Sequence, residues 1–310
     1  MDFADPRLPR VRRIAWALAA LSLLVVLVSA YIRLGGAGLG CAAWPECYGQ
    51  LLAGAPHPHT GWVRILHRTA ASAALLLGFW LAWQCTRPVP LRPLSGHASA
   101  LLAVMILLTV VGLFSADPHR VWAGFINMLG GLLLVLISWR IAALAGGKSP
   151  APAARVDGAL RLGLVLLAAA MALGAMIGAR YAALACPTTP SCAGTWWPAG
   201  AGLAALNPVA MVAAPLAAGD AGGVALHLLH RYAALAALLL LGLAALRGLG
   251  QPSARGAALT VLALVVVEFA LGGLTVASGF SLGLAVAHSV GAALLLVAGV
   301  RYAGRLPASG

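Results

Sequence analysis

Residues 224–246 read VALHLLHRYAALAALLLLGLAAL, and this stretch decides the class of fold. His227, His230 and Arg231 stand near its beginning, and almost all the other side chains are apolar. The stretch is long enough to cross a bilayer, which takes about 20 apolar residues. Every backbone polar group must be paired within the segment in lipid, so we expect it to be a helix.

Seven further stretches have the same length and apolar character. With the first, the expected helices are Ile14–Leu34, Val63–Cys85, Ala98–Ser115, Val121–Ile141, Leu160–Arg180, Val224–Leu246, Ala257–Ala277 and Leu282–Tyr302. The 310 residues are 62% hydrophobic and only 9% charged, whereas soluble domains carry roughly 25% charged residues. The sequence therefore predicts an all-α integral membrane protein with eight transmembrane helices in the lipid bilayer.

The basic residues predict how these helices are oriented. If the helices alternate, most basic residues fall on one side, which the positive-inside rule assigns to the cytoplasm. They are Arg7, Arg10, Arg12, Arg13, Arg87, Arg92, Arg140, Lys148, Arg155, Arg161, Arg247, Arg255, Arg301 and Arg305. Both termini are then cytoplasmic. Arginine far outnumbers lysine, which indicates a GC-rich bacterial genome and hence the bacterial inner membrane.

The net charge of +13 is mostly a topology signal. Nucleic-acid binding is not expected, since no soluble domain carries a basic patch. Some arginines nevertheless lie at the outer ends of helices, where basic residues are fewer. They are Arg33, Arg64, Arg68, Arg120, Arg180 and Arg231. Anionic groups such as carboxylates could hold them there, or their long side chains could simply extend to the interface.

The chain repeats itself. The pair Cys41 and Cys47 follows the first expected helix, and Cys186 and Cys192 follow the fifth at the same spacing. His67-Arg68 in the second helix corresponds to His230-Arg231 in the sixth, and Val111-Gly112-Leu113 in the third to Gly272-Gly273-Leu274 in the seventh. Such symmetry indicates a duplicated membrane bundle, with sites inside each half or at the joint. We expect two pseudo-symmetric four-helix bundles, residues 1–145 and 159–310, with a cytoplasmic linker at 146–158.

The four cysteines of the repeat face outward in this topology. That compartment is oxidising in bacteria, so disulfides within each pair are expected, Cys41 with Cys47 and Cys186 with Cys192. A redox-active dithiol or a metal site are the alternatives, although zinc sites usually have tighter cysteine spacing.

Three histidines lie inside apolar stretches, namely His67, His230 and His288. An ionisable residue at membrane depth is costly and marks a candidate functional site. His230 and His288 each lie about two turns from the outer end of their helix, by a 3.6-residue turn. Two imidazoles at matched depth can occupy both axial positions of a heme iron, whereas a single hydrogen bond between helices would explain each histidine alone.

Two outer loops resemble a known family. Residues 31–49, YIRLGGAGLGCAAWPECYG, and residues 181–198, YAALACPTTPSCAGTWWP, are similar to the corresponding loops of heme A synthases. The His-Arg pairs and the run Ala287-His288-Ser-Val-Gly fit as well. The resemblance extends from Arg12 to about Tyr302.

The resemblance implies an oxidoreductase that converts heme O to heme A for cytochrome oxidase, by oxidising the C8 methyl group of the porphyrin to a formyl group. It implies that His230 and His288 are the axial ligands of a heme b (iron protoporphyrin IX). His67 would bind the iron of the substrate in the N-terminal half. Arg68 and Arg231 could pair with propionates, since arginine suits carboxylates. A heme O synthase would supply the substrate; the electron acceptor and any homo-oligomer stay open.

Two positions depart from the family pattern. Asn127 stands where the repeat would place a histidine equivalent to His288, and Arg64 stands where the family tends to have a glutamate three residues before His67. His119 is a conceivable substitute ligand. The alternative function is therefore a degenerate paralogue that binds heme b and serves cytochrome oxidase assembly or heme delivery, and a third is an unrelated transporter. Glu268 could relay protons or be a neutral, hydrogen-bonded acid.

Overall fold

The computed structural model describes residues 5–34, 61–115, 117–147, 157–200 and 203–306. Long helices fill most of these ranges. They are α1 (Leu8–Leu34), α3 (Gly61–Thr86), α4 (Leu94–Phe114), α5 (Val121–Ala145), α6 (Gly158–Ala179), α7 (Ala221–Gly248), α8 (Arg255–Ala277) and α9 (Leu282–Ala303). Eight helices in this part of the chain are long and apolar enough to span a membrane. The prediction of an all-α protein with eight transmembrane helices is confirmed.

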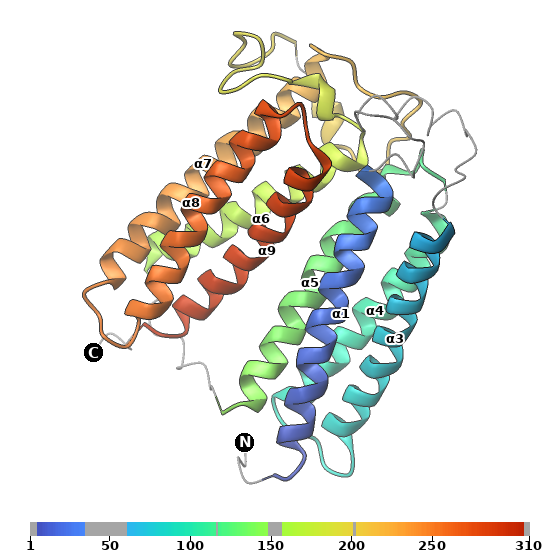
Figure 1. The fold of residues 1–310 in the computed structure, drawn as a ribbon, viewed down its shortest axis with the longest axis vertical. Helices are drawn as coiled ribbons and strands as arrows, with labels where there is room; N and C mark the ends of the chain where they lie inside the picture. The colour runs from blue at the N-terminus through green and yellow to red at the C-terminus, as the bar shows by residue number, and fades with distance from the viewer. Residues whose placement is uncertain (1–4, 35–60, 116, 148–156, 201–202, 307–310) are drawn as a thin grey trace.

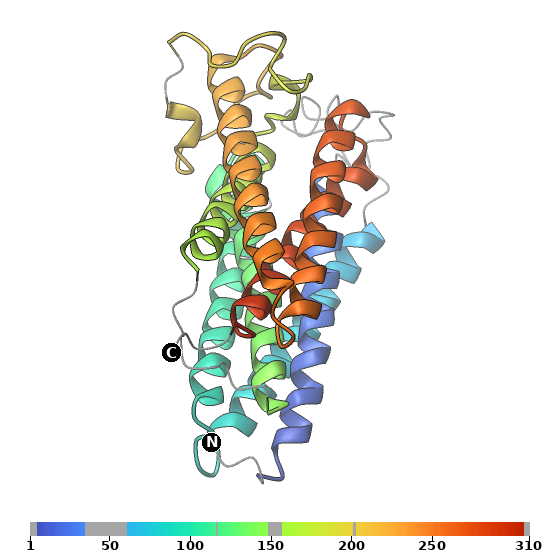
Figure 2. The ribbon, with the colours of Figure 1, turned by 90° about the vertical axis from the view of Figure 1, so that its left-hand side faces the viewer.

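The helices pack as two bundles of four. In the first bundle α1 contacts α3 and α5, and α4 contacts the same two helices. In the second bundle α6 contacts α7 and α9, and α8 contacts the same two helices. The bundles stand side by side and meet through α1, α5, α6 and α9 (Figure 1, Figure 2). In each bundle two helices are therefore diagonal to one another across the interior: α3 with α5, and α7 with α9.

The first helix begins at Leu8, earlier than the expected Ile14, because its first turn is tied to a neighbouring connection. Arg7 donates to the Asp5 carboxylate at 2.8 Å and to the main-chain oxygens of Gln84, Arg87 and Val89. The arginine holds the pKa of the Asp5 carboxyl below its usual value through these hydrogen bonds. Hydropathy alone predicts that this basic segment lies in water outside the helix. Its contacts with the α3–α4 connection instead stabilise it as the first turn of α1.

Two helices begin at aspartate caps. Asp220 accepts a hydrogen bond from the Gly223 main-chain nitrogen at 2.7 Å at the start of α7. Asp157 accepts from Ala159 at 3.1 Å at the start of α6. A carboxylate there satisfies a main-chain N–H that has no partner inside the helix. The caps explain why α7 begins at Ala221, a few residues before the apolar stretch that begins at Val224.

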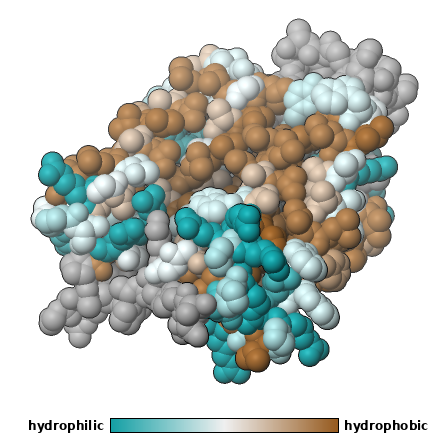
Figure 3. All heavy atoms as spheres, turned by 60° about the horizontal axis from the view of Figure 1, so that its bottom comes forward, coloured by the Kyte–Doolittle hydropathy of each residue, from teal (hydrophilic) through white to brown (hydrophobic). Residues whose placement is uncertain are grey.

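Apolar side chains cover the flanks of the molecule, as a bilayer requires. Large exposed examples include Leu76, Leu113, Leu239, Val266 and Phe269. Figure 3 shows hydrophobic side chains over most of the visible flank and hydrophilic ones gathered towards the end that carries the termini. Buried polar side chains are few in the described part of the chain, and Glu268 and His227 are among them. These exceptions lead to the site.

Candidate functional site

His230 on α7 and His288 on α9 face each other across the second bundle. Their ring centres are 6.2 Å apart and their planes are nearly perpendicular, at 88°. The two helices are diagonal in the bundle, so the rings meet in its interior. The equal depth of His230 and His288 in their predicted helices suggested that the two rings would meet, and in the fold they do.

Each ring is held through its Nδ1 atom. His230 Nδ1 donates to the main-chain oxygen of Ala170 on α6 at 2.8 Å. His288 Nδ1 lies 2.5 Å from Oε2 of Glu268 on α8, although the two groups are not aligned as a hydrogen bond. Neither Nε2 makes a hydrogen bond to a described residue, so a proton on Nδ1 leaves each Nε2 with a free lone pair.

Two glycines give the rings room. A Cβ atom added at Gly174 on α6 would lie 3.2 Å from Cε1 of His230, and one added at Gly272 on α8 would lie 3.4 Å from Cε1 of His288. Gly174 follows Ala170 by one helical turn, so the missing side chain lets the His230 ring reach the Ala170 carbonyl. The rings are thus fitted against bare helix backbone on both sides of the bundle.

The site has a buried back and a more open front. The Glu268 side chain is 4% exposed, whereas that of His288 is 28% exposed. His288 Nδ1 is fully buried, so the exposed part of the ring lies elsewhere. This gradient places the carboxylate in the apolar interior and leaves the rest of the imidazole accessible to a bound group.

The donor set fits a heme. Metal–imidazole bonds of about 2 Å on either side of one metal place two ring centres roughly 6 Å apart, close to the 6.2 Å observed. A heme needs only two axial donors, because the porphyrin fills the other four positions. Among the described residues no group of three or more His, Cys, Asp or Glu side chains could hold a bare metal ion.

A disulfide loop lies over the N-terminal part of α7. Cys186 and Cys192 form a disulfide. Arg231 donates to the carbonyls of Cys186 and Pro190, both at 3.2 Å, and Tyr232 Oη donates to the carbonyl of Trp196 at 2.6 Å. The residues that follow His230 therefore hold this loop, which uses part of the Arg231 hydrogen-bonding capacity. Cys41 and Cys47 lie outside the described residues.

Two further histidines have structural partners. His227 Nε2, one turn from His230, donates to the Ala182 carbonyl at 2.8 Å and is buried. His119 Nδ1 donates to the Val212 carbonyl at 2.7 Å. Val212 in turn donates from its main-chain nitrogen to the His119 oxygen at 3.1 Å. His119 thus joins the connection before α5 to the segment before α7, and no described contact ties it to His67.

The first bundle presents a different set of groups. His67 on α3 is half-buried, and Arg64 and Arg68 beside it are exposed. Asn127 on α5 is half-buried on the helix that is diagonal to α3. Within the described ranges no second imidazole faces His67, and none of these four side chains makes a hydrogen bond.

Comparison with known proteins places the whole arrangement in a family. The family model COX15-CtaA, described as cytochrome oxidase assembly protein, matches residues 12–59 and 126–300. A heme A synthase from Shewanella oneidensis is 29% identical over 89% of this chain and 90% of its own length. The chain belongs to the heme A synthase family. The heme A synthase of Sphingopyxis alaskensis is 26% identical over 94% of this chain and 90% of that protein.

A second kind of relative also shares sequence with this member of the heme A synthase family. The protoheme IX farnesyltransferase of Thermus thermophilus is 32% identical over 34% of this chain, but over only 18% of its own length. The resemblance is therefore confined to a part of each protein.

The match to the heme A synthase family is uneven along the chain. The matched segments include His230, Glu268 and His288, but they leave out residues 60–125. The omitted residues carry α3, α4 and His67. This member of the family therefore departs from the family model over α3 and α4 of its first bundle.

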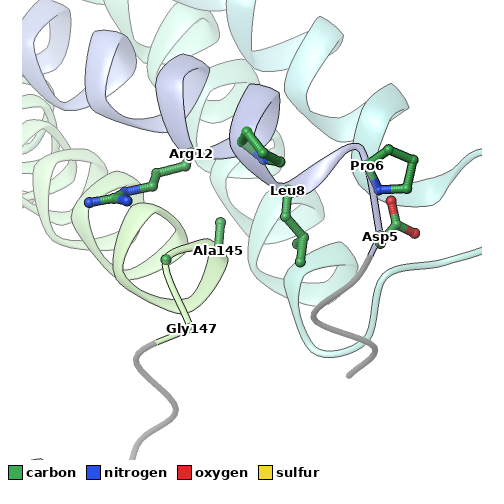
Figure 4. A pocket seen from close by; sticks show the side chains of 8 residues that line it. Asp5, Pro6, Leu8, Arg12, Ala145 and Gly147 are labelled. Atoms are coloured by element: carbon green, nitrogen blue, oxygen red, sulfur yellow. The ribbon is translucent and has the colours of Figure 1, made fainter.

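A pocket of about 430 Å3 lies at the other end of the first bundle, between the start of α1 and the end of α5 (Figure 4). It is lined by Asp5, Pro6, Leu8, Pro9, Arg12, Ala145, Gly146 and Gly147. None of these residues belongs to the site that the heme A synthase pattern indicates. The pocket is therefore separate from the paired histidines, which lie towards the N-terminal ends of α7 and α9.

The sequence alone did not assign three contributors to the site of the paired histidines. Glu268 was singled out, but its proximity to His288 depends on how α8 and α9 pack. Gly174 and the Ala170 carbonyl carry no distinctive motif. The sequence offered one weak signal for these two positions on α6, a glycine one turn after a small residue. Small residues at this spacing are common in membrane helices, so the signal did not single out the site.

Proposed function

We propose that the C-terminal half holds a heme b through His230 and His288. The observation that carries this proposal is the pair of facing imidazoles, each held at Nδ1 and unbonded at Nε2. A bound heme supplies one-electron redox chemistry at its iron. The chain's own part is to fix both rings, through the Ala170 carbonyl and Glu268, and to surround them with apolar helices.

The same proposal gives the protein a role in heme A biosynthesis as a heme A synthase. The substrate is heme O, whose C8 methyl becomes a formyl group. Two successive hydroxylations, each with an oxygen from water, take four electrons and four protons in all and give a geminal diol. Loss of one water from the diol gives the aldehyde, and an electron acceptor receives the four electrons. His67 binds the substrate in the N-terminal half, and Arg68 and Arg231 contact propionates. The relatives named heme A synthase support this reading.

The partner that supplies heme O is a heme O synthase. The partial similarity to a protoheme IX farnesyltransferase supports that link. The basic residues at one set of helix ends support a place in the bacterial inner membrane with both termini in the cytoplasm. In this orientation both candidate heme positions lie towards the outer leaflet.

A second candidate function is heme b binding without catalysis, in cytochrome oxidase assembly or heme delivery. Three observations favour it: Asn127 and Arg64 depart from the family pattern, and residues 60–125 fall outside the family match. An asparagine is a weak iron ligand, and an arginine cannot replace a carboxylate as a proton acceptor. These observations concern only the N-terminal half, so heme b in the C-terminal half is common to both candidates.

Co-expression with a heme O synthase separates the two functions. Hemes extracted from those cells are resolved by chromatography and mass spectrometry, beside cells that carry His67→Ala. We expect heme A with the wild-type chain and little with His67→Ala. Heme b and heme O without heme A would instead assign the protein to the non-catalytic function.

A further inference from the structure

Glu268 is an acidic side chain in an apolar bundle. It lies near the middle of α8, is 4% exposed, and has no hydrogen bond to a described residue. Burying a carboxyl group without a partner is costly. The polar atom that approaches it is Nδ1 of His288, at 2.5 Å. Any role of Glu268 at the site therefore involves its contact with His288.

The chemistry of iron binding decides which group donates. His288 can bind a metal through Nε2 only if Nε2 carries the lone pair, so the ring proton must be on Nδ1. Glu268 Oε2 then has to be the acceptor of that proton. Metal-bound histidines commonly donate their second N–H to a carboxylate or a main-chain carbonyl, which orients the ring and raises its basicity.

The two histidines differ in this respect. His230 donates to a neutral main-chain oxygen, that of Ala170, whereas His288 faces a carboxylate. A negative charge next to one axial ligand favours the ferric over the ferrous state, because the oxidised iron carries the larger positive charge. The pair is therefore asymmetric, and His288 is the stronger donor.

The position of Glu268 is built into the bundle by a glycine. Gly291 lies three residues after His288 on α9, and a Cβ added there would collide with Glu268 Oε1. In the first bundle, Gly130 lies three residues after Asn127 on α5, and a Cβ there would collide with Leu108. An apolar side chain thus packs against Gly130 in the first bundle, whereas a carboxyl group packs against Gly291 in the second.

We propose that Glu268 is a positioning residue that orients His288 and lowers the midpoint potential of the heme in the C-terminal half. The inference rests on the proposed function, because it requires the heme between His230 and His288. The arrangement belongs to one half only, since in the other half Asn127 stands in place of His288 and Leu108 packs against Gly130.

Redox titration of the purified full-length chain tests the proposal. Glu268→Gln keeps an oxygen that accepts from Nδ1 but removes the charge, so the low-spin spectrum should persist. The ferrous state should become favoured by about tenfold, which is about 59 mV for one electron. Glu268→Leu removes the acceptor as well, so the ring loses its orientation and the low-spin fraction should fall. Thr275→Val, which removes a buried hydroxyl from the same helix, is the control.

Each outcome decides a different statement. Unchanged potential in Glu268→Gln together with an unchanged low-spin fraction in Glu268→Leu overturns the role of Glu268 and leaves the heme site intact. A wild-type protein without low-spin heme overturns the heme site itself. If Glu268→Gln loses heme while Thr275→Val keeps it, Glu268→Asp decides. If Glu268→Asp restores low-spin heme at a potential within about 59 mV of wild type, the role of the charge is supported. If Glu268→Asp does not restore it, that role is refuted.

Discussion

The two bundles share a scaffold but differ at the positions that could hold iron. Both bring a glycine three residues after the diagonal partner of a histidine, at Gly130 and Gly291. In the second bundle that partner is His288 with Glu268 behind it, and in the first it is Asn127 with Leu108. The comparison teaches that two four-helix bundles can share their helix packing while their polar groups differ, because glycines and apolar side chains determine how closely helices approach.

The two halves also differ in how their candidate ligands are supported. Loop contacts in the second half are extensive, since Arg231 and Tyr232 hold the Cys186–Cys192 loop. The first half keeps His67, but no second imidazole faces it among the described residues. A preformed pair of ligands suits a resident cofactor, whereas a single ligand with a free opposite side suits a substrate that must enter and leave.

The largest effect is expected from breaking the pair with His230→Ala. The iron would lose one of its two protein ligands, so the low-spin b-type absorbance should fall below about a tenth of wild type. Reduced-minus-oxidised spectra at equal protein concentration measure it. The matched control is His227→Ala, one turn away, which removes a hydrogen bond worth about 1 kcal/mol and should keep the heme. A full signal in His230→Ala would refute the ligand assignment.

The next largest effect concerns the other half. His67→Ala should reduce heme A formation by about tenfold or more in cells that make heme O, while the low-spin signal of the second half stays at its wild-type level. His97→Ala is the control, because that ring bonds the Pro93 carbonyl at the opposite end of the first bundle. Equal heme A yields from wild type and His67→Ala would remove the first bundle from the reaction.

Two adjacent glycines sharpen the account of the second half. Gly272 faces the His288 ring, whereas nothing lies within 4 Å of a Cβ added at Gly273. Overpacking costs about 1–3 kcal/mol, so Gly272→Val should weaken heme retention about fivefold or more. Gly273→Val should retain heme as the wild type does. Heme loss on dilution into detergent measures both; equal loss from the two variants would show that ring placement does not depend on Gly272.

The smallest expected effect is a gain. Asn127→His supplies the first bundle with a second imidazole diagonal to His67, so the heme content per chain should rise towards twofold, as the second bundle already has such a pair. Pyridine hemochrome assay against total protein gives the ratio. Asn127→Gln keeps an amide and should leave the ratio unchanged. A ratio that stays at the wild-type value in Asn127→His would show that the two bundles differ in more than their polar residues.

Much of this organisation could be predicted from residue patterns alone. Hydropathy predicted eight helices, because apolar length is a local property, and equal depth predicted that His230 and His288 would meet. The start of α1 at Leu8 could not be predicted, since it depends on Arg7 reaching the carbonyls of the α3–α4 connection. The approach of Glu268 to His288 was missed for the same reason: it depends on the relative position of two helices along their axes.

The role expected for Arg231 shows a further limit. The sequence placed it beside His230 and suggested a propionate partner, while the structure shows it bonded to the carbonyls of Cys186 and Pro190. An arginine has several donors, and sequence alone does not say which acceptors a neighbouring loop will offer. Its contact with a propionate stays a prediction.

Electron paramagnetic resonance of the purified wild-type chain, with the extracted heme quantified, tests the central claim most directly. The account predicts a low-spin ferric signal typical of two imidazole ligands and one heme b for each chain in the second bundle. A preparation from heme-sufficient cells that contains no heme, or only high-spin heme, would contradict it.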